Sequence, residues 1–341
     1  MRAAVIKESK KIVVEEVEEQ LVPSGEVLIN VVKNGICGSD IHYWELGLPA
    51  GLIMGHEFCG TVLDPGSRED LKKGDRVTAL PISPCGKCPA CLSGNVQYCK
   101  YTWADASGLS LSHPGGFTQN IHVRPDLVIK VPDNVSDEAA AMCEPLAVGL
   151  HAAHLADIKV GAKVLVVGGG IIGLVSAMFA KTEGATFVGV SETNSKRGEN
   201  AVKLKVADAW FDATKDNFLE EVLKVAENGF DVVIDCSGNS KAVESCINVV
   251  KPGGTVVLVG VSMSPIEFNS LIAVMKELTL KGAIAYTYNE FKTCLELMDN
   301  KQIDPLKFLS KVITLDETQD AFVELSSGTS DAIKILVDPN K

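Results

Sequence analysis

Two patterns of hydrophobic and polar residues divide this chain. From Met1 to about Asp64, short apolar and β-branched runs, of which Val27 to Val32 is the clearest, are separated by Gly and Pro. Such runs predict strands joined by turns, so we expect a partly open β-barrel rather than helices in this segment. The pattern continues through Gly74 to Val77 and from Val128 to Val131, which extends the predicted β-domain.

After about residue 147 the pattern changes to strands that alternate with helices. Lys163 to Val167 contains a continuous apolar run, typical of a strand buried on both faces of a parallel sheet, and helical periodicity follows from Leu174 to Lys181. Further strands are predicted at Thr186 to Val190, Ala209 to Phe211, Asp231 to Asp235, Thr255 to Gly260 and Leu278 to Ala283, with helices at Asn217 to Ala226 and Ser240 to Val250. This alternation predicts an α/β class domain with a doubly wound parallel sheet of six strands.

The length of 341 residues is too great for one compact core, and the 46% hydrophobic content is sufficient for two. We therefore predict a first domain over residues 1–147, a second over 148–285, and a return to the first over 286–341. The returning segment contains a predicted helix from Phe291 to Met298 and a last strand near Ala332 to Val337.

Charge and composition narrow the class of protein. The formal net charge of −12 argues against a nucleic-acid or anionic-membrane partner, because either would need a basic surface. The N-terminus runs directly into a strand-like segment, and the apolar stretches are interrupted well before membrane-spanning length. We expect a cytosolic protein, in which the ten cysteines are thiols or metal ligands rather than disulfides.

Four cysteines are concentrated in one short, weakly apolar loop over residues 84–100. They are Cys85, Cys88, Cys91 and Cys99. Four thiolates at this spacing can close a tetrahedron around zinc and replace the hydrophobic core that the loop lacks. This favours a structural zinc site, with an iron–sulfur cluster or a redox dithiol as alternatives.

A second group of candidate metal ligands lies earlier, in Cys37-Gly38-Ser39-Asp40-Ile41-His42 and Gly55-His56-Glu57. Cys37, His56 and Glu57 supply one ligand of each common zinc-binding type, which fits a three-point grip with an open coordination position. Glu144 is a fourth candidate, directly or through water. The alternative is a small buried thiol, a core histidine and a surface acid.

A glycine-rich turn follows the strand Lys163 to Val167 and precedes a helix. Its G-x-G-x-x-G sequence consists of Gly168, Gly169, Gly170, Ile171, Ile172 and Gly173. In this context the motif predicts dinucleotide binding, with Gly168, Gly170, Ile171, Ile172 and Gly173 at the cofactor. Glu192 ends the next strand, where an acid holds the ribose hydroxyls.

The order C-G-S-D-x-H followed by G-H-E resembles the zinc-dependent medium-chain dehydrogenases of the alcohol dehydrogenase superfamily. The segment Cys37 to Trp44 is most similar to their polyol (sorbitol) branch, and Cys143-Glu144-Pro145 also resembles threonine dehydrogenases. The resemblance implies a GroES-like catalytic domain, a Rossmann domain and two zinc ions per chain. It also implies hydride transfer between NAD and a secondary alcohol of a polyol, amino alcohol, diol or cyclic polyol, with zinc stabilising the alkoxide.

The same resemblance implies roles for individual residues. Ser39 and His42 would relay the substrate proton, Glu57 would act at the catalytic metal, and Asp40 would orient His56. Tyr43 and Phe117 would line the substrate pocket, although each ring is as well explained as core. Sorbitol-type enzymes commonly present an arginine beside a tyrosine to the substrate hydroxyls in the region that corresponds to Ala285-Tyr286-Thr287-Tyr288, and this chain has no arginine there, which argues against sorbitol itself as the substrate.

Cofactor choice depends on the end of the second predicted strand. Ser191 replaces the aspartate of many NAD-specific relatives, which opens room for the phosphate of NADP beside Lys196 or Arg197. Glu192 opposes this, because a carboxylate that faces a phosphate dianion costs a few kcal/mol. We therefore expect NAD, with NADP less favoured.

Two other functions share parts of this sequence. A zinc-free quinone or enone reductase has the same fold, and a zinc-ribbon binding protein or redox sensor would use only the four-cysteine loop. The leading prediction is an enzyme with a small-molecule alcohol or ketone substrate. The resemblance and the apolar region from Thr255 to Ala285 also predict a homodimer or homotetramer.

Overall fold

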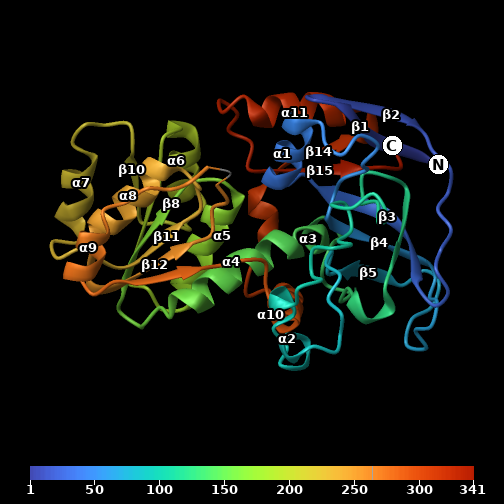
Figure 1. Ribbon diagram of the computed structural model, residues 1–341, viewed down its shortest axis with the longest axis horizontal. Helices are drawn as coiled ribbons and strands as arrows, with labels where there is room; N and C mark the ends of the chain where they lie inside the picture. The colour runs from blue at the N-terminus through green and yellow to red at the C-terminus, as the bar shows by residue number, and fades with distance from the viewer. Residues whose placement is uncertain (263) are drawn as a thin grey trace. The chain divides into compact units, whose positions relative to one another are not determined.

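The computed structural model describes residues 1–262 and 264–341, which form two compact units. One unit comprises Met1–Glu144 and Tyr286–Lys341, and the other comprises Pro145–Ala285. The first is therefore built from both ends of the sequence. Figure 1 shows the result: the strand β15 (Lys334–Asp338), in red, runs antiparallel to β3 (Val27–Gly35), in blue, with Leu336 opposite Gly35.

The first unit is organised by a seven-stranded sheet in the order β14-β15-β3-β4-β5-β7, with β6 also paired to β3, and by the hairpin β1-β2. These strands are β1 (Arg2–Glu8), β2 (Lys11–Glu16), β4 (Glu57–Asp64), β5 (Arg76–Ala79), β6 (Asn120–Val123), β7 (Val128–Lys130) and β14 (Leu309–Thr314). Alternate residues of β3 are buried until Lys33, after which Asn34 and Gly35 are both buried. The strand thus enters the interior at the end that reaches Glu57, which pairs with Gly35.

Short helices complete this unit. They are α1 (Gly38–Leu46), α2 (Pro89–Leu92), α3 (Asp137–Ala141), the first residues of α4 (Cys143–Ala156), α10 (Tyr288–Asp299) and α11 (Thr318–Ser326). The expectation of strands without helices up to Asp64 is therefore wrong at α1. The Cys37 N–H donates to Asp40 Oδ2 at 2.9 Å, and Gly47 ends the helix in the left-handed conformation (φ 68°), so local capping produces a helix that hydrophobic periodicity does not reveal.

The second unit has the six-stranded parallel sheet predicted from the sequence, in the order β10-β9-β8-β11-β12-β13. Its strands are β8 (Lys163–Val167), β9 (Phe187–Glu192), β10 (Ala209–Asp212), β11 (Phe230–Asp235), β12 (Val250–Leu258) and β13 (Thr279–Gly282). The chain moves in opposite directions across the sheet from β8 to β9 and from β11 to β12. Ligands of such sheets bind at this reversal, outside the carboxyl ends of the strands.

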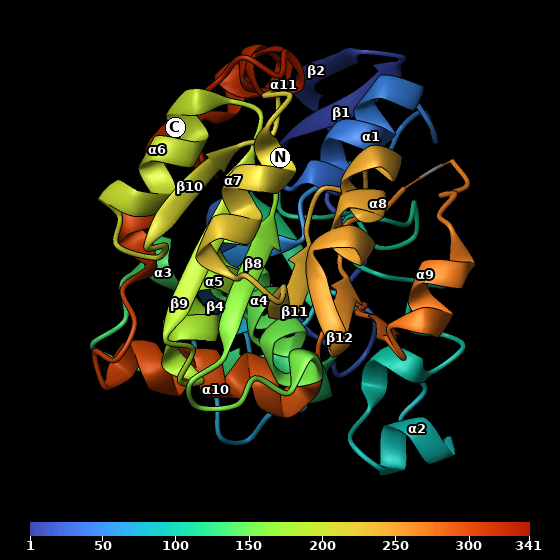
Figure 2. The same ribbon diagram turned by 90° about the vertical axis from the view of Figure 1, so that its left-hand side faces the viewer.

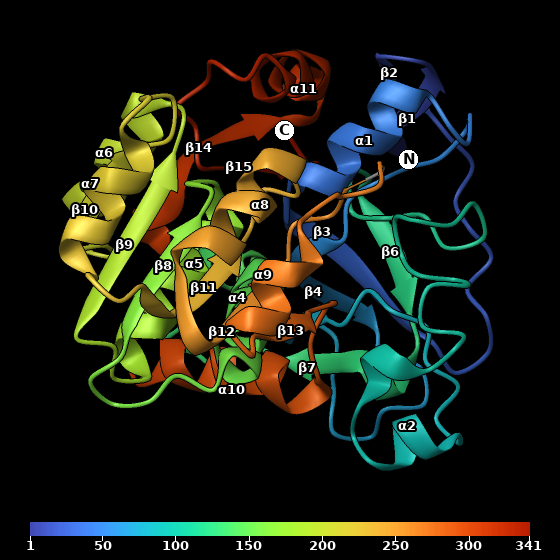
Figure 3. The same ribbon diagram turned by 60° about the vertical axis from the view of Figure 1, so that its left-hand side comes forward.

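Helices cover both faces of this sheet (Figures 2 and 3). They are α5 (Ile171–Thr182), α6 (Ser195–Lys203), α7 (Phe218–Val225), α8 (Ser240–Val249) and α9 (Ser270–Met275). Because crossovers between parallel strands are right-handed, α5 and α8 lie on opposite faces. Across the residues that the structure describes, we find no helix whose length and apolar content would allow it to span a bilayer.

Candidate functional site

Cys37, His56 and Glu57 come together at the buried end of the β3–β4 pair. One ligand atom of each lies within 4.8 Å of the others. Cys37 occupies the N-cap position of α1, whereas Glu57 begins β4 and directly follows His56. The three predicted ligands are therefore brought together by the beginning of α1, which carries Cys37, and the beginning of β4, which carries Glu57 after His56.

The two ring nitrogens of His56 face different groups. Nε2 lies 3.4 Å from Ser39 Oγ, and Nδ1 lies 3.4 Å from Asp40 Oδ1. Asp40 is therefore beside the ring as predicted, but neither Asp40 Oδ1 nor His56 Nδ1, both buried, completes a hydrogen bond among the described residues. Burial lowers the pKa of His56, but the negative charges at Asp40 and Cys37 outweigh it and raise the pKa well above its ordinary value.

This environment fits a bound cation. Thiolate, imidazole and carboxylate are the ligands that zinc prefers, and the surrounding acids favour positive charge at the position of His56. A metal would take the place of the protons that the group otherwise holds. Cys37, His56 and Glu57 can therefore hold a catalytic zinc, with room in the ligand set for one more group.

Glu57 has a partner that sequence reasoning missed. Lys334 Nζ donates to both carboxylate oxygens, at 2.8 and 2.6 Å, and also to the Ile36 carbonyl at 2.9 Å. The side chains of Lys334 and Glu57 are 0% and 1% exposed. Burial lowers the pKa of Lys334, but the Glu57 carboxylate more than compensates and raises it above its ordinary value. The ammonium of Lys334 thus places a buried positive charge next to the cluster of Cys37, His56 and Glu57.

Glu144 lies near this group but is not among the three residues whose ligand atoms cluster within 4.8 Å. Burial raises the pKa of Glu144 to about 7, while the nearby His56 lowers it and Glu57 raises it. Tyr286, from the segment that resembles the substrate-contacting region of sorbitol-type enzymes, lies beside Glu144. Burial and the Glu144 carboxylate hold the pKa of Tyr286 well above its ordinary value. Glu144 can therefore exchange protons near neutral pH beside the metal ligands.

The predicted relay and substrate residues occupy different environments. Ser39 contacts the His56 ring, and His42, one helical turn later on α1, is exposed. Tyr43 is half-buried against the core of the first unit. The substrate role of Phe117 needs correction, because its side chain is 0% exposed and packs edge-on against Phe322 with 5.9 Å between ring centroids. Such a ring belongs to the core.

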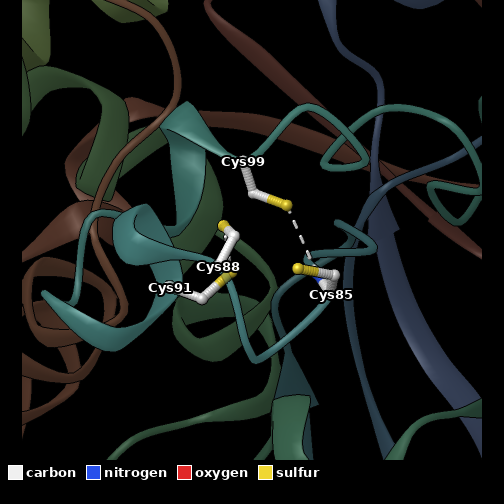
Figure 4. A group of neighbouring side chains, drawn as sticks. All are labelled: Cys85, Cys88, Cys91 and Cys99. Atoms are coloured by element: carbon white, nitrogen blue, oxygen red, sulfur yellow. Dashed lines mark hydrogen bonds between the residues drawn. The ribbon is translucent and has the colours of Figure 1, made fainter.

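The four cysteines of the residue 84–100 loop form a second cluster. Their sulfur atoms lie within 4.8 Å of one another and point toward a common space (Figure 4). Backbone N–H groups of Cys85 and Tyr101 donate to Cys99 Sγ at 3.4 and 3.5 Å and lower the pKa of Cys99 to about 6. All four residues of α2 are at least partly exposed, so this loop has little core of its own. Four converging thiols, one of them stabilised as thiolate, fit a closed structural zinc site.

The glycine-rich turn of the second unit has the geometry of a phosphate-binding loop. Gly168 has φ 105°, and a Cβ at Gly173 would lie 1.9 Å from the Gly168 carbonyl oxygen, so both positions require glycine. A Cβ at Gly170, the N-cap of α5, would instead meet open space among the described residues. Ile171 and Ile172 form the first turn of α5, where backbone N–H groups have no carbonyl partner within the helix. An anion can therefore approach these N–H groups past Gly170.

Glu192 lies beside this turn at the end of β9. Its Oε2 accepts from the Gly169 N–H at 2.6 Å, and its Oε1 accepts from the Thr193 and Asn194 N–H groups at 2.7 and 2.8 Å. The carboxylate lines a cavity of about 400 Å³ that is also lined by Gly168 and Lys241. Lys241 was missed because it follows β11, far from the motif. The predicted Arg197 lies on α6, half-buried.

Comparison with protein families matches both units. Residues 23–133 match the alcohol dehydrogenase GroES-like domain, and residues 172–300 match the zinc-binding dehydrogenase family. A probable D-xylulose reductase A from Aspergillus clavatus is 33% identical over 324 residues, which cover 92% of this chain and 89% of the relative. Sorbitol dehydrogenase from Bacillus subtilis is 31% identical, covering 100% and 98% of the two chains.

A solved structure is similar over nearly the whole chain. A protein described as a zinc-binding dehydrogenase from Sinorhizobium meliloti, bound to NADP, is 30% identical and superposes with a TM-score of 0.87, with 99% of each chain covered. The sequence-based identification of a GroES-like domain and a domain with a doubly wound parallel sheet is therefore confirmed.

Proposed function

This chain belongs to the zinc-type medium-chain dehydrogenases, and from this premise we propose that it catalyses hydride transfer between a secondary alcohol of a polyol or diol and a nicotinamide cofactor. The observation that carries the proposal is the buried convergence of Cys37, His56 and Glu57, beside Ser39. A zinc-free reductase of the same fold has no use for these three ligands together, and a zinc-ribbon protein needs only the four-cysteine loop.

The chain's own residues supply the surroundings for this reaction. Cys37, His56, Glu57 and Glu144 would hold a catalytic zinc, and the cysteines 85, 88, 91 and 99 a structural one. When bound, the catalytic zinc supplies Lewis acidity toward the substrate oxygen and the nicotinamide supplies the hydride acceptor. Ser39 would take up the substrate's hydroxyl proton as it releases its own to His42. His42, one turn along α1 and exposed, would then pass a proton to solvent.

We propose NAD as the preferred cofactor. Glu192 is held in place by three backbone N–H groups, so it can accept hydrogen bonds from the ribose hydroxyls of adenosine. The same fixed negative charge repels the additional phosphate of NADP. Two observations favour NADP instead: one relative binds NADP, and Lys241, a cation that could pair with the additional phosphate, lines this cavity. Kinetics with both cofactors decide between them.

We further propose that the protein is a homodimer or homotetramer. β13 is an edge strand of the six-stranded sheet, and exposed apolar side chains surround it and α9. They are Val261, Leu271, Val274, Met275, Leu280 and Ile284. An exposed edge strand with an apolar surround is a suitable surface for pairing with a second copy.

The test is a panel of polyols, diols and their ketones, followed at the nicotinamide absorbance, with wild-type protein and Cys37→Ala. We expect turnover of at least one polyol–ketone pair by the wild type. Cys37→Ala should lose nearly all turnover and about one zinc per chain while it still binds the nucleotide. Full turnover after removal of that zinc would exclude the proposal.

A further inference from the structure

A third group of metal-binding side chains lies apart from the two clusters described above. Glu26, His113 and His122 each place one ligand atom within 4.8 Å of the others. All three belong to the first unit, and none belongs to the predicted catalytic or structural metal sites. The sequence gives no motif for them, because they are separated by 87 and 9 residues.

Strand pairing brings two of these residues, Glu26 and His122, close together. In the β3–β6 pair, His122 lies opposite Leu28. Glu26 directly precedes β3, two residues before Leu28, and its side chain reaches His122. Glu26 Oε2 lies 2.6 Å from His122 Nδ1, and the two side chains are 13% and 6% exposed. This part of the group is therefore largely removed from solvent.

His113 reaches the same place from the loop that precedes β6. Its Nδ1 lies 2.8 Å from Asp105 Oδ2. Asp105 Oδ1 in turn accepts hydrogen bonds from the hydroxyls of Ser110, at 3.1 Å, and Ser112. His113 Nδ1 does not complete a hydrogen bond among the described residues. A small rotation of the ring would let Asp105 accept from Nδ1–H and leave Nε2 to bind a metal, as in carboxylate–histidine–zinc arrangements. The rings of His113 and His122 are 5.1 Å apart between centroids.

We propose that Glu26, His113 and His122 bind a divalent transition-metal ion, zinc foremost, in a third site with an open coordination position. Two imidazoles and one carboxylate form a ligand set typical of zinc with a free position. Glu26 and Asp105 together carry two negative charges, which balance a dication, and Arg124, which also lines the cavity, is paired with Asp126. A cavity of about 320 Å³, lined by Glu26, Asp105 and His113, gives the ion and its water access to the site.

The ion would join the loop of residues 105–117 to the edge of the sheet. The hydrogen bond between Glu26 and His122 must open to admit it, because a metal replaces the proton that these groups share. Affinity should therefore be weaker than at the thiolate sites. The alternative to a metal site is a hydrogen-bonded network of the same side chains that fixes the loop. Metal titration distinguishes the two, because only a metal site takes up a further ion.

The experiment titrates Co²⁺ into the protein whose thiolate sites already hold zinc, followed by calorimetry and visible absorbance. We expect about one further equivalent per chain, with ligand-field bands but without the sulfur-to-metal charge-transfer absorption that a thiolate site gives. His113→Asn and His122→Gln should each weaken this binding at least 10-fold, and Asp105→Asn by about 10-fold to 100-fold. His154→Asn, on the second unit, is the matched control and should bind as the wild type does.

Folding of each variant is checked by circular dichroism and by retention of the zinc at the thiolate sites. Glu26→Gln keeps the size of the side chain and its hydrogen bond to His122, so it tests loss of the carboxylate ligand even if a histidine variant misfolds. Absence of a further equivalent in the wild type would overturn the proposal. Equal Co²⁺ binding by wild type, Glu26→Gln and His113→Asn would also overturn it, because it would show adventitious binding elsewhere.

Discussion

Lys334 supplies a buried positive charge beside the candidate metal ligands Cys37, His56 and Glu57. Its ammonium is fully buried against the Glu57 carboxylate. A buried ion pair contributes little relative to a well-packed apolar pair, but loss of one partner leaves an uncompensated charge in the interior. The effects of substituting Lys334 and Glu57 on stability are therefore expected to be coupled rather than additive. Their separation by 277 residues explains why the sequence did not reveal them.

In protein freed of the catalytic zinc, Lys334→Met should lower the free energy of unfolding by about 3–5 kcal/mol, because Glu57 would remain buried without any cation. The double variant Lys334→Met/Glu57→Gln should recover much of this loss. Urea unfolding measures both. Lys311→Met, which removes the exposed pair with Glu324, is the control and should cost less than about 1 kcal/mol. Equal losses for Lys334→Met and Lys311→Met would contradict the assigned role.

Glu192→Ala should raise the KM for NAD and reduce the ratio of kcat/KM for NAD to that for NADP by about 10-fold or more, since a fixed carboxylate no longer discriminates against phosphate. Steady-state kinetics with both cofactors measures this ratio. Glu199→Ala, an exposed acid on α6, is the control and should leave the ratio unchanged. A wild-type enzyme that prefers NADP would show that Lys241 or Arg197 decides instead.

At the scale of elements, we expect the folded conformation of the four-cysteine loop to depend on the metal that its four thiolates would bind. α2 and its neighbours lack a core, and the converging thiols supply the only common centre among the described residues of that loop. Cys91→Ser should therefore lose about one zinc per chain and lower Tm, while the zinc at Cys37 stays bound. Metal analysis and thermal unfolding measure the two effects.

Ser93→Ala is the control for that loop, because it removes two exposed hydrogen bonds, one to the Ala90 carbonyl and one from the Asn95 amide, and no sulfur ligand. It should keep both metals and unfold at nearly the wild-type temperature. If Cys91→Ser kept its zinc and its stability and lost turnover alone, the loop would have a catalytic rather than a structural role.

β15 is joined to β3 by charge as well as by backbone pairing. Asp338 Oδ2 lies 3.2 Å from Lys33 Nζ. Burial raises the pKa of Asp338, but hydrogen bonds from the Asn340 N–H and Lys33 outweigh it and lower the pKa below the ordinary value of 3.8. Because the folded-state pKa is the lower one, this contribution to stability is present above pH 3.8 and is lost as pH falls through the folded-state pKa.

Asp338→Asn should therefore be less stable than the wild type by on the order of 1 kcal/mol at pH 7, and the difference should shrink as the pH falls below about 4. Unfolding in urea across this pH range measures it. Asp316→Asn, an exposed acid, is the control. A difference that stayed constant to pH 2.5 would show that the charge of Asp338 has no part in the effect.

The sequence predicts elements well where one periodicity dominates. β8 and β11 are apolar runs buried on both faces, and the structure places them at the centre of the parallel sheet. α1 was missed because only Asp40 and Trp44 of its nine residues are buried, so it has no apolar face to detect. The candidate ligands Cys37 and His56 were found because they lie in short motifs. Tyr286 lies in a segment that the resemblance already associated with the substrate. Lys334 was not found, since only folding brings it to the site.

At the scale of the whole molecule, the exposed edge of the parallel sheet predicts self-association. β13 and α9 expose Leu280 at 36% and Met275 at 75%. Light scattering should give a dimer or tetramer, and Leu280→Lys should reduce the mass, because it places a charge in the apolar surface. Leu219→Lys on α7 is the control and should keep the wild-type mass. A monomeric wild type at working concentration would refute the assembly.

The buried contact between Glu57 and Lys334 also constrains biosynthesis. Glu57 leaves the ribosome 277 residues before its partner, and the entire Pro145–Ala285 unit is synthesised in between. At about 5–20 residues per second, the acid waits roughly 15–55 s without its cation. The Pro145–Ala285 unit can fold during this interval, whereas the group of side chains around Cys37 acquires its full set of charges only when β15 is synthesised. Metal incorporation at Cys37 should accordingly be a late event in the maturation of each chain.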